Sequence, residues 1–196
     1  MAAPPLGGRL RHAKIVRMDT SRSTGRPWLS TAGALLIAAL LIAALLHAPA
    51  LALEAPKGPV ILSVTGALTH PNDNGTASFD MALLATLPQR SFSTKTPWFP
   101  QPRKFTGVLV RDLLDAVGSK AGIARAIALN DYRADMPTDE LIKNDAMIAY
   151  LLDDQPMPVR EKGPLVIIFP FSDRPELRNA VHYSRAVWQL RSLELR

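Results

Sequence analysis

The segment Phe105-Thr-Gly-Val-Leu-Val-Arg-Asp-Leu-Leu-Asp-Ala-Val-Gly118 narrows the choice of fold most. Residues 108–117 predict an amphipathic helix, because their apolar and charged side chains fall on opposite helical faces. The final glycine favours a helix end at this point, since it can adopt the left-handed conformation. The apolar face contains Leu109, Leu113, Leu114 and Val117, and the polar face contains Arg111, Asp112 and Asp115. Such a helix indicates a sheet that it covers.

Apolar runs on either side predict the strands of that sheet. Residues 60–64 show too little alternation of apolar and polar side chains for an exposed edge strand. They therefore predict a strand buried on both faces. Turn-rich segments separate most of the other runs. These further strands are expected over residues 89–96, 124–130, 132–136, 146–152 and 165–169.

Two more helices are expected from their capping signals. Ser78 can cap a helix over residues 79–87, and Pro88 ends it because the residue before a proline avoids the helical region. Thr138 precedes two acidic residues, which are stabilising at the positive end of a helix. A further helix is therefore expected to begin at Thr138.

The last strand requires an irregularity. Trp188 and Leu190 share one face of a regular strand, whereas Leu193 and Leu195 fall on the other. A β-bulge near residues 191–192 restores the register. Together these elements predict a mixed α/β (α+β) fold, mainly mixed β-sheet with a few short covering helices.

The N-terminal segment has the pattern of an export signal. Basic residues precede an apolar core over residues 32–46, and Ala50-Leu-Ala52 offers a cleavage site. The core is shorter than the about 20 residues that a membrane span needs, which favours cleavage over a permanent anchor. Met18 is an alternative start. We expect a signal peptide over residues 1–52, a single domain over 53–196 and a periplasmic location, with an inner-membrane anchor as the alternative.

Most of the net charge lies in that segment. The chain has 23 Lys/Arg and 17 Asp/Glu, a net charge of +6, and residues 1–52 hold six of the former and one of the latter. The remaining domain is therefore nearly neutral and has no nucleic-acid footprint, so no nucleic-acid partner is expected. The sequence contains no cysteine, which excludes a disulfide framework.

From Pro59 onward the chain resembles the molybdopterin-binding domain of the sulfite oxidase family. Seven segments follow one another in the family's order, and the run over residues 105–118 is similar to the family's W-x-G-V-x-L-x-D-L-L-x-x-A-G pattern. The segments span residues 59–66, 79–88, 105–118, 129–137, 148–158, 162–170 and 186–194. The resemblance implies that family's fold, its molybdopterin cofactor and an oxidoreductase activity.

The chain departs from this family where a cysteine thiolate holds the metal. The strand over residues 89–96 lies at that place and offers only Ser93, Thr94 and Thr96. A hydroxyl is a poor substitute for a thiolate, which is soft and far more easily deprotonated. The export segment also lacks the adjacent arginine pair of signals that export folded proteins. We therefore expect no metal site and no bound cofactor; molybdopterin is the alternative that the resemblance implies.

Other catalytic motifs are absent from the sequence. His70 and His182 are isolated, and neither has a second histidine or a cysteine at ligand spacing. No Gly-rich phosphate loop and no G-x-S-x-G elbow occurs, so a kinase or hydrolase is not indicated. Four acidic residues in turns and at a helix start are read as solvated surface charge; they are Asp135, Asp139, Glu140 and Asp145. No catalytic residue is predicted.

The resemblance does imply a ligand pocket, formed by the strand at the cysteine position and the loops beside it. The matching positions hold Thr94, Thr96, Trp98, Arg103, Asn130, Tyr132, Arg160 and Lys162. A polar connection before the last strand is long enough to add to the rim of the pocket. It contributes Arg178, Tyr183 and Arg185.

Two residue groups in this set have more than one interpretation. Arg160 and Lys162 flank a turn and can bind sulfate, phosphate or a carboxylate, or they are exposed and pair with neighbouring acidic residues. Trp98 lies in a proline-rich loop, where it predicts either a lid on a pocket or an anchor for a partner. Trp188 is expected in the core.

Two functions follow from these observations. The first is an exported periplasmic module without molybdenum that binds a small anion or passes a signal to a membrane-bound partner. The second is a working molybdopterin-dependent oxidoreductase that acts on a small sulfur or nitrogen oxo-compound with a membrane-bound redox partner. The missing cysteine favours the first.

Overall fold

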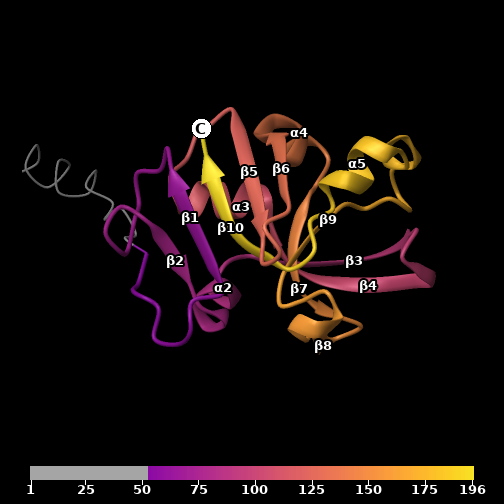
Figure 1. Cartoon of the computed structure of the whole chain (residues 1–196), viewed down its shortest axis with the longest axis horizontal. Coiled ribbons are helices and arrows are strands. Elements are labelled where there is room, and N and C mark those ends of the chain that lie inside the picture. Colours follow the sequence, from indigo (N-terminus) through magenta and orange to yellow (C-terminus); the bar gives the residue numbers. More distant parts are fainter. Residues whose placement is uncertain (1–52) are drawn as a thin grey trace, which may run out of the picture. The chain divides into compact units, whose positions relative to one another are not determined.

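The computed structural model describes residues 53–196, so the predicted export segment lies outside the described residues. These residues form two sheets (Figure 1). In the first sheet β1 and β10 are parallel neighbours, and the other pairs are antiparallel. Its strands, in spatial order, are β2 (Ala77–Phe79), β1 (Leu62–Gly66), β10 (Leu190–Leu195), β5 (Ile123–Ala128) and β6 (Arg133–Pro137).

The second sheet is antiparallel, and its long β3–β4 ribbon runs across the direction of β1 and β10 in Figure 1. Strand β7 is its hub, because it pairs with β4, β8 and β9. The strands are β3 (Gln89–Thr96), β4 (Phe99–Leu109), β7 (Met147–Leu152), β8 (Gln155–Pro156) and β9 (Val166–Ile168).

Short helices cover these sheets, and among residues 53–196 no helix is long and apolar enough to cross a membrane. The α-helices are α2 (Met81–Thr86), α3 (Val110–Ala116), α4 (Thr138–Lys143) and α5 (Ala180–Arg185), and the 3₁₀ turns are η1 (Val159–Glu161) and η2 (Pro175–Leu177). The predicted fold class, mainly mixed β-sheet with a few short helices, is confirmed.

The two sheets meet where the chain enters β10. The backbone of Trp188 bridges to Val166 of β9. Two hydrogen bonds flank this bridge: the Ile167 N–H donates to Val187 O at 2.9 Å, and the Leu190 N–H donates to Leu165 O at 3.0 Å. Trp188 therefore lies at the seam between the sheets.

The predicted helix over residues 108–117 begins later in the structure. Val108 and Leu109 end β4, where they pair with Ile148 and Met147, so the sheet ladder takes their backbone groups before α3 begins. Strand pairing thus overrides the helical pattern at these two residues. The end of the helix agrees with prediction: Gly118 follows it with a φ of +65°, the left-handed conformation. The predicted apolar face is buried.

The helix predicted over residues 79–87 is shorter, and the expected cap at Ser78 is wrong. Ser78 and Phe79 belong to β2. Asp80 caps α2 instead: its carboxylate accepts hydrogen bonds from the Leu83 N–H at 2.7 Å and the Gly58 N–H at 2.6 Å. It also accepts from the Lys57 N–H at 2.8 Å. An ionised carboxylate with three N–H donors is a stronger cap than a serine hydroxyl.

The strand expected over residues 60–64 also shifts. It lies at Leu62–Gly66 and is buried on one face only, since Leu62 and Val64 are buried while Ser63 and Thr65 are partly exposed. The prediction of burial on both faces is therefore wrong. The expected bulge in the last strand is confirmed, because the β10–β5 register shifts between Leu190 and Ser192.

Glycine at position 107 is required by a close approach of two strands. A Cβ at Gly107 in β4 would contact the Ile148 carbonyl oxygen and lie 2.6 Å from Ala149 Cα in β7. Both neighbours are backbone atoms of the hub strand, which side-chain rotation cannot move away.

The variant Gly107→Ala is expected to lower the free energy of unfolding by about 1–3 kcal/mol, the usual cost of overpacking. Gly122→Ala is the matched control, because a Cβ there meets nothing within 4 Å; its effect should stay within about 0.5 kcal/mol. Urea unfolding followed by circular dichroism measures both. Equal stability of the two variants would show that the close approach of β4 and β7 does not require glycine at position 107.

Asp80 makes stability depend on pH. Its N–H donors, first Leu83 and then Gly58, hold the pKa of the Asp80 carboxyl below its usual value, although burial opposes them. Because the pKa is lower in the folded state, the stabilisation is complete above the unfolded-state pKa of about 3.9 and is lost as the pH falls through the folded-state value.

Asp80→Asn should therefore reduce stability at neutral pH and differ less from the parent in acid. Urea unfolding between about pH 7 and pH 2.5 measures this convergence. Asp173→Asn, at an exposed aspartate, is the control and should change stability little at any pH. If the free energies of unfolding of Asp80→Asn and the parent differ by the same amount at every pH, ionisation of Asp80 does not contribute to the pH dependence of stability.

Candidate functional site

The turn between β3 and β4 carries Trp98 onto a cluster of aromatic side chains. The Trp98 ring meets the edge of Trp188 at a centroid distance of 5.3 Å and that of Tyr183 at 5.9 Å, each with an interplanar angle of 82°. Edge-to-face pairs of this kind contribute about 0.5–1.5 kcal/mol each beyond their burial. We call the following residues the aromatic cluster: Trp98, Phe99, Phe105, Phe171, Tyr183 and Trp188.

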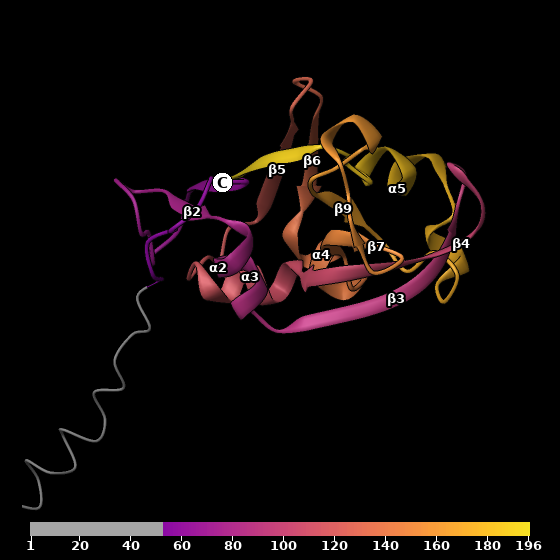
Figure 2. The same cartoon turned by 90° about the horizontal axis from the view of Figure 1, so that it is seen from below.

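Beside this cluster lies a cavity of about 240 Å³. Four of the residues predicted from the sequence line it: Trp98, Asn130, Tyr132 and Tyr183. Its remaining lining comes from Ser184, Ala186, Trp188 and Gln189. Figure 2 shows the β3–β4 turn beside the chain that leads into α5, so the cavity joins segments far apart in the sequence.

The cavity wall is tied together by hydrogen bonds. The Tyr132 hydroxyl donates to the Ser184 carbonyl oxygen at 2.8 Å, and Asn130 Oδ1 accepts from the Tyr132 N–H at 3.1 Å. Gln189 has a φ of +52°, and its side chain donates to the Val159 carbonyl oxygen at 2.7 Å. The β5–β6 hairpin, η1 and the entry to β10 therefore meet at this site.

Sequence reasoning missed the second half of this lining. Trp188 was expected in the core. In the structure it packs on the core and also lines the cavity. The available signal was the indole N–H of Trp188, a donor that needs a partner when it is buried. Nothing in the sequence marks Gln189, whose position depends on the left-handed turn into β10.

The strand predicted at the cysteine position offers Ser93, Thr94 and Thr96, and of these three Thr94 is fully buried. Its Oγ1 accepts a hydrogen bond from the Ser172 N–H at 2.9 Å, and the Lys95 N–H donates to Ser172 Oγ at 2.8 Å. Thr94 therefore joins β3 to the loop after β9 and does not line the cavity.

Two buried polar atoms near Trp98 have no hydrogen-bond partner among the described residues. They are Thr96 Oγ1 and Trp188 Nε1. Thr96 is 8% exposed and pairs across the turn with Phe99, whose ring contacts Trp188 at 6.0 Å. Unsatisfied buried groups are rare in folded proteins, so this pair of atoms marks the turn as unusual.

Most basic residues of the predicted pocket are engaged elsewhere. Arg178 donates to the Phe171 carbonyl oxygen at 2.6 Å and to the Ser172 carbonyl oxygen at 3.0 Å. Arg103 pairs with Asp153, and Arg185 pairs with Glu140. Because these guanidinium groups are already matched, they fix loops and strands rather than forming a free cationic patch.

Arg160 and Lys162, the predicted anion-binding pair, do not form one binding site. Arg160 is highly exposed and lies 3.5 Å from Glu161, so it has the surface pairing that the sequence left open. Lys162 adopts a left-handed conformation, and its Nζ lies 5.2 Å from the centroid of the Trp188 ring. Of this pair, Lys162 is the residue that contacts the aromatic cluster.

The histidines and carboxylates serve local structure. His70 Nδ1 lies 3.2 Å from the Ala116 carbonyl oxygen, and His182 Nδ1 lies 3.1 Å from Asn179 Oδ1. Burial lowers the pKa of the His182 imidazole. Asp145 pairs with Arg111 and Arg174. Within residues 53–196, no three His, Cys, Asp or Glu side chains gather in a group that could hold a metal ion.

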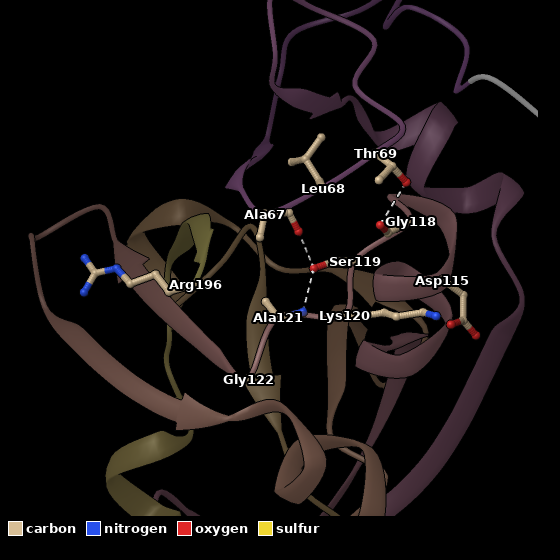
Figure 3. Close-up of a pocket in the computed structure, with 10 residues that line it drawn as sticks. All are labelled: Ala67, Leu68, Thr69, Asp115, Gly118, Ser119, Lys120, Ala121, Gly122 and Arg196. Carbon is tan, nitrogen blue, oxygen red and sulfur yellow. Dashed lines mark hydrogen bonds between the residues drawn. The ribbon is translucent and has the colours of Figure 1, made fainter.

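A second cavity, of about 840 Å³, lies elsewhere and is drawn in Figure 3. None of the predicted site residues lines it. Its polar groups are used internally: the Thr69 hydroxyl donates to the Gly118 carbonyl oxygen, and the Ser119 hydroxyl donates to the Ala67 carbonyl oxygen and accepts from the Ala121 N–H. This groove is large and open but has few uncommitted donors, so we place the candidate site at the aromatic cluster.

Comparisons with known proteins agree with the fold. Residues 76–172 match the family model of the oxidoreductase molybdopterin binding domain. Among solved structures, the chain is similar to the sulfane dehydrogenase SoxCD from Paracoccus pantotrophus, with 16% sequence identity and a TM-score of 0.53. The match covers 74% of this chain but only 40% of that chain, so it shows the fold alone. No curated protein matches this chain.

Thr94 is expected to be structural. Thr94→Val leaves the Ser172 N–H without its acceptor and should lower the free energy of unfolding by about 1–3 kcal/mol. Thr94→Ser keeps the oxygen and should lose less, about 1 kcal/mol for the missing methyl group. Urea unfolding of both variants measures the difference. If valine is tolerated as well as serine, the bond to Ser172 does not hold the loop.

Proposed function

The chain belongs to the oxidoreductase molybdopterin-binding domain family, and from that premise we propose that it is an exported periplasmic module that keeps the family fold without molybdenum and binds a small anion. The observation that carries the proposal is that the strand at the expected metal-ligand position offers only hydroxyl groups. Thr94 is buried, and its hydroxyl is hydrogen-bonded to the loop after β9.

The residues present do not fit a molybdenum centre. The sequence has no cysteine, so no thiolate can come from this chain. Threonine is a hard, weakly acidic ligand, whereas thiolates are the soft ligands that such sites use. The only other buried hydroxyl on this strand, that of Thr96, lies in the ladder position opposite Phe99. We therefore derive no redox step for this chain.

The size of the cavity also favours a small ligand. Pockets for drug-sized molecules usually measure about 300–1,000 Å³, and the cavity beside the aromatic cluster is smaller, at about 240 Å³. Trp98 and Tyr183 occupy its wall with their rings. The cavity suits a molecule of a few heavy atoms better than a pterin cofactor.

The N-terminal sequence supports export without a preloaded cofactor. Basic residues, an apolar core and an A-x-A site have the pattern of a secretory signal, and no adjacent arginine pair of the folded-export type is present. A chain that crosses the membrane unfolded cannot carry a folded-in cofactor. The surface around Trp98 offers a membrane-bound signalling protein a place to sense the bound anion.

The test is an analysis of the protein purified from its native periplasm for molybdenum and, by fluorescence, for pterin. We expect neither in stoichiometric amount. A molybdoenzyme purified in parallel from the same cells serves as the control for cofactor supply and recovery. A stoichiometric molybdenum signal would overturn the proposal and make the alternative, a molybdopterin-dependent oxidoreductase with an unusual ligand set, the leading function.

A further inference from the structure

We propose that the anion is a small carboxylate, that it binds under Trp98, and that Trp98 is the lid over its site. This inference rests on the proposed function and names the ligand class. In the bound state, one carboxylate oxygen accepts from the Trp188 Nε1–H and the other accepts from the Thr96 hydroxyl. Both groups are buried and have no partner among the described residues.

The two unpartnered groups come from different segments that meet at the β3–β4 turn: Thr96 lies at the end of β3, and Trp188 lies just before β10 and packs on Trp98. Trp98 follows Thr96 by two residues and contacts the Trp188 ring at 5.3 Å. Thr96 pairs with Phe99, and Phe99 contacts Trp188 at 6.0 Å. A ligand that enters between the turn and Trp188 therefore reaches both groups.

Their hydrogen-bonding chemistry selects an acceptor. A tryptophan N–H only donates, and a threonine hydroxyl can donate as well as accept. Leaving a buried donor unpaired costs about 1–3 kcal/mol, which a bound acceptor recovers. A planar group with two acceptor oxygens satisfies both donors, and it lies flat between aromatic rings.

The local charge favours an anion. Lys162 Nζ lies 5.2 Å from the Trp188 ring centroid, and it forms no ion pair within residues 53–196. The neighbouring cations are neutralised, since Arg185 pairs with Glu140 and Arg191 pairs with Asp131. Within the part of the chain that the structure describes, Lys162 is thus a cation without an ion pair that contacts the Trp188 ring.

The lid follows from accessibility. Trp188 lines the cavity, but its Nε1 atom is buried, so a ligand in the cavity reaches this atom only after a neighbouring group moves. Trp98 is the neighbour free to move, because it is partly buried and lies in the turn at the end of the β3–β4 ribbon. Phe105 and Phe99, which also contact Trp188, are held in β4.

Indole N–H resonances of the intact ¹⁵N-labelled protein report on this site directly. Trp98→Phe assigns the Trp188 signal by elimination, because Trp98 and Trp188 are the two tryptophans of the domain over residues 53–196. Titration with acetate, benzoate and sulfate at matched ionic strength is the measurement. We expect a saturable downfield shift of the Trp188 Nε1–H with a carboxylate and little shift with sulfate; acetate against benzoate tells how large a group the site accepts.

Three variants test the contacts. Thr96→Val should weaken carboxylate binding about tenfold through the lost charged hydrogen bond, and Thr96→Ser should restore it. Lys162→Gln, at an exposed residue, should weaken binding without changing stability, so the proposal stays testable if Thr96→Val unfolds. Thr106→Val is the matched control: this β4 threonine bonds to Ser91 at 2.7 Å, away from the cavity, and should leave affinity unchanged.

The lid has its own readout. Trp98→Ala should speed hydrogen exchange of the Trp188 indole N–H with D₂O by on the order of tenfold, because local opening governs the exchange of buried groups. Trp98→Phe, which keeps a ring, should change it much less. Exchange that is already fast in the parent, or unchanged in Trp98→Ala, would refute the lid.

The outcomes separate this inference from the proposed function. A Trp188 signal that no carboxylate moves overturns the carboxylate site, and it indicates a bridging water if the signal is nevertheless protected. A sulfate response as strong as the carboxylate response overturns the ligand class. In either case a molybdenum-free preparation still supports the proposed function, whereas stoichiometric molybdenum overturns the function whatever the spectra show.

Discussion

The close approach of β4 and β7 at Gly107 is the constraint on which the rest of the domain depends. Without a side chain at that position, the two backbones pair across the centre of the second sheet. Strand β4 then projects in two directions: one end turns at Trp98, and the other runs directly into α3. A single strand thus links helix α3 to the candidate site.

Local sequence signals predicted elements that depend on short-range chemistry. Gly118 ends α3 in the left-handed conformation, and the spacing of Leu190 and Leu193 indicated the bulge in β10. Errors arose where distant partners decide the outcome. The backbone of Val108 pairs with β7, and Asp80 receives N–H donors from a segment more than twenty residues earlier. Such partners leave no trace in a sequence window.

The candidate site shows the same division. Family resemblance placed Trp98, Asn130 and Tyr132 in a pocket, the length of the polar connection added Tyr183 to its rim, and all four line one cavity. The resemblance could not tell which arginines are free to bind a ligand. The sequence does not show whether a guanidinium group contacts a ligand, a carboxylate or a carbonyl group. Nor could it predict that Trp188 would be left with an unpartnered N–H, which depends on how segments far apart in the sequence pack around it.

The parallel pairing of β1 with β10 has a consequence for how the domain forms. Ser63 lies opposite Ser192, so β1 can pair with β2 early but meets its parallel neighbour β10 only when the last strand is present. Closing so long a loop is entropically costly, and contacts this distant in sequence slow folding. The first sheet therefore stays open while the chain is still emerging, on whichever side of the membrane that occurs. Loss of the final six or seven residues would remove the central strand of that sheet and leave β1 and β5 without their shared partner.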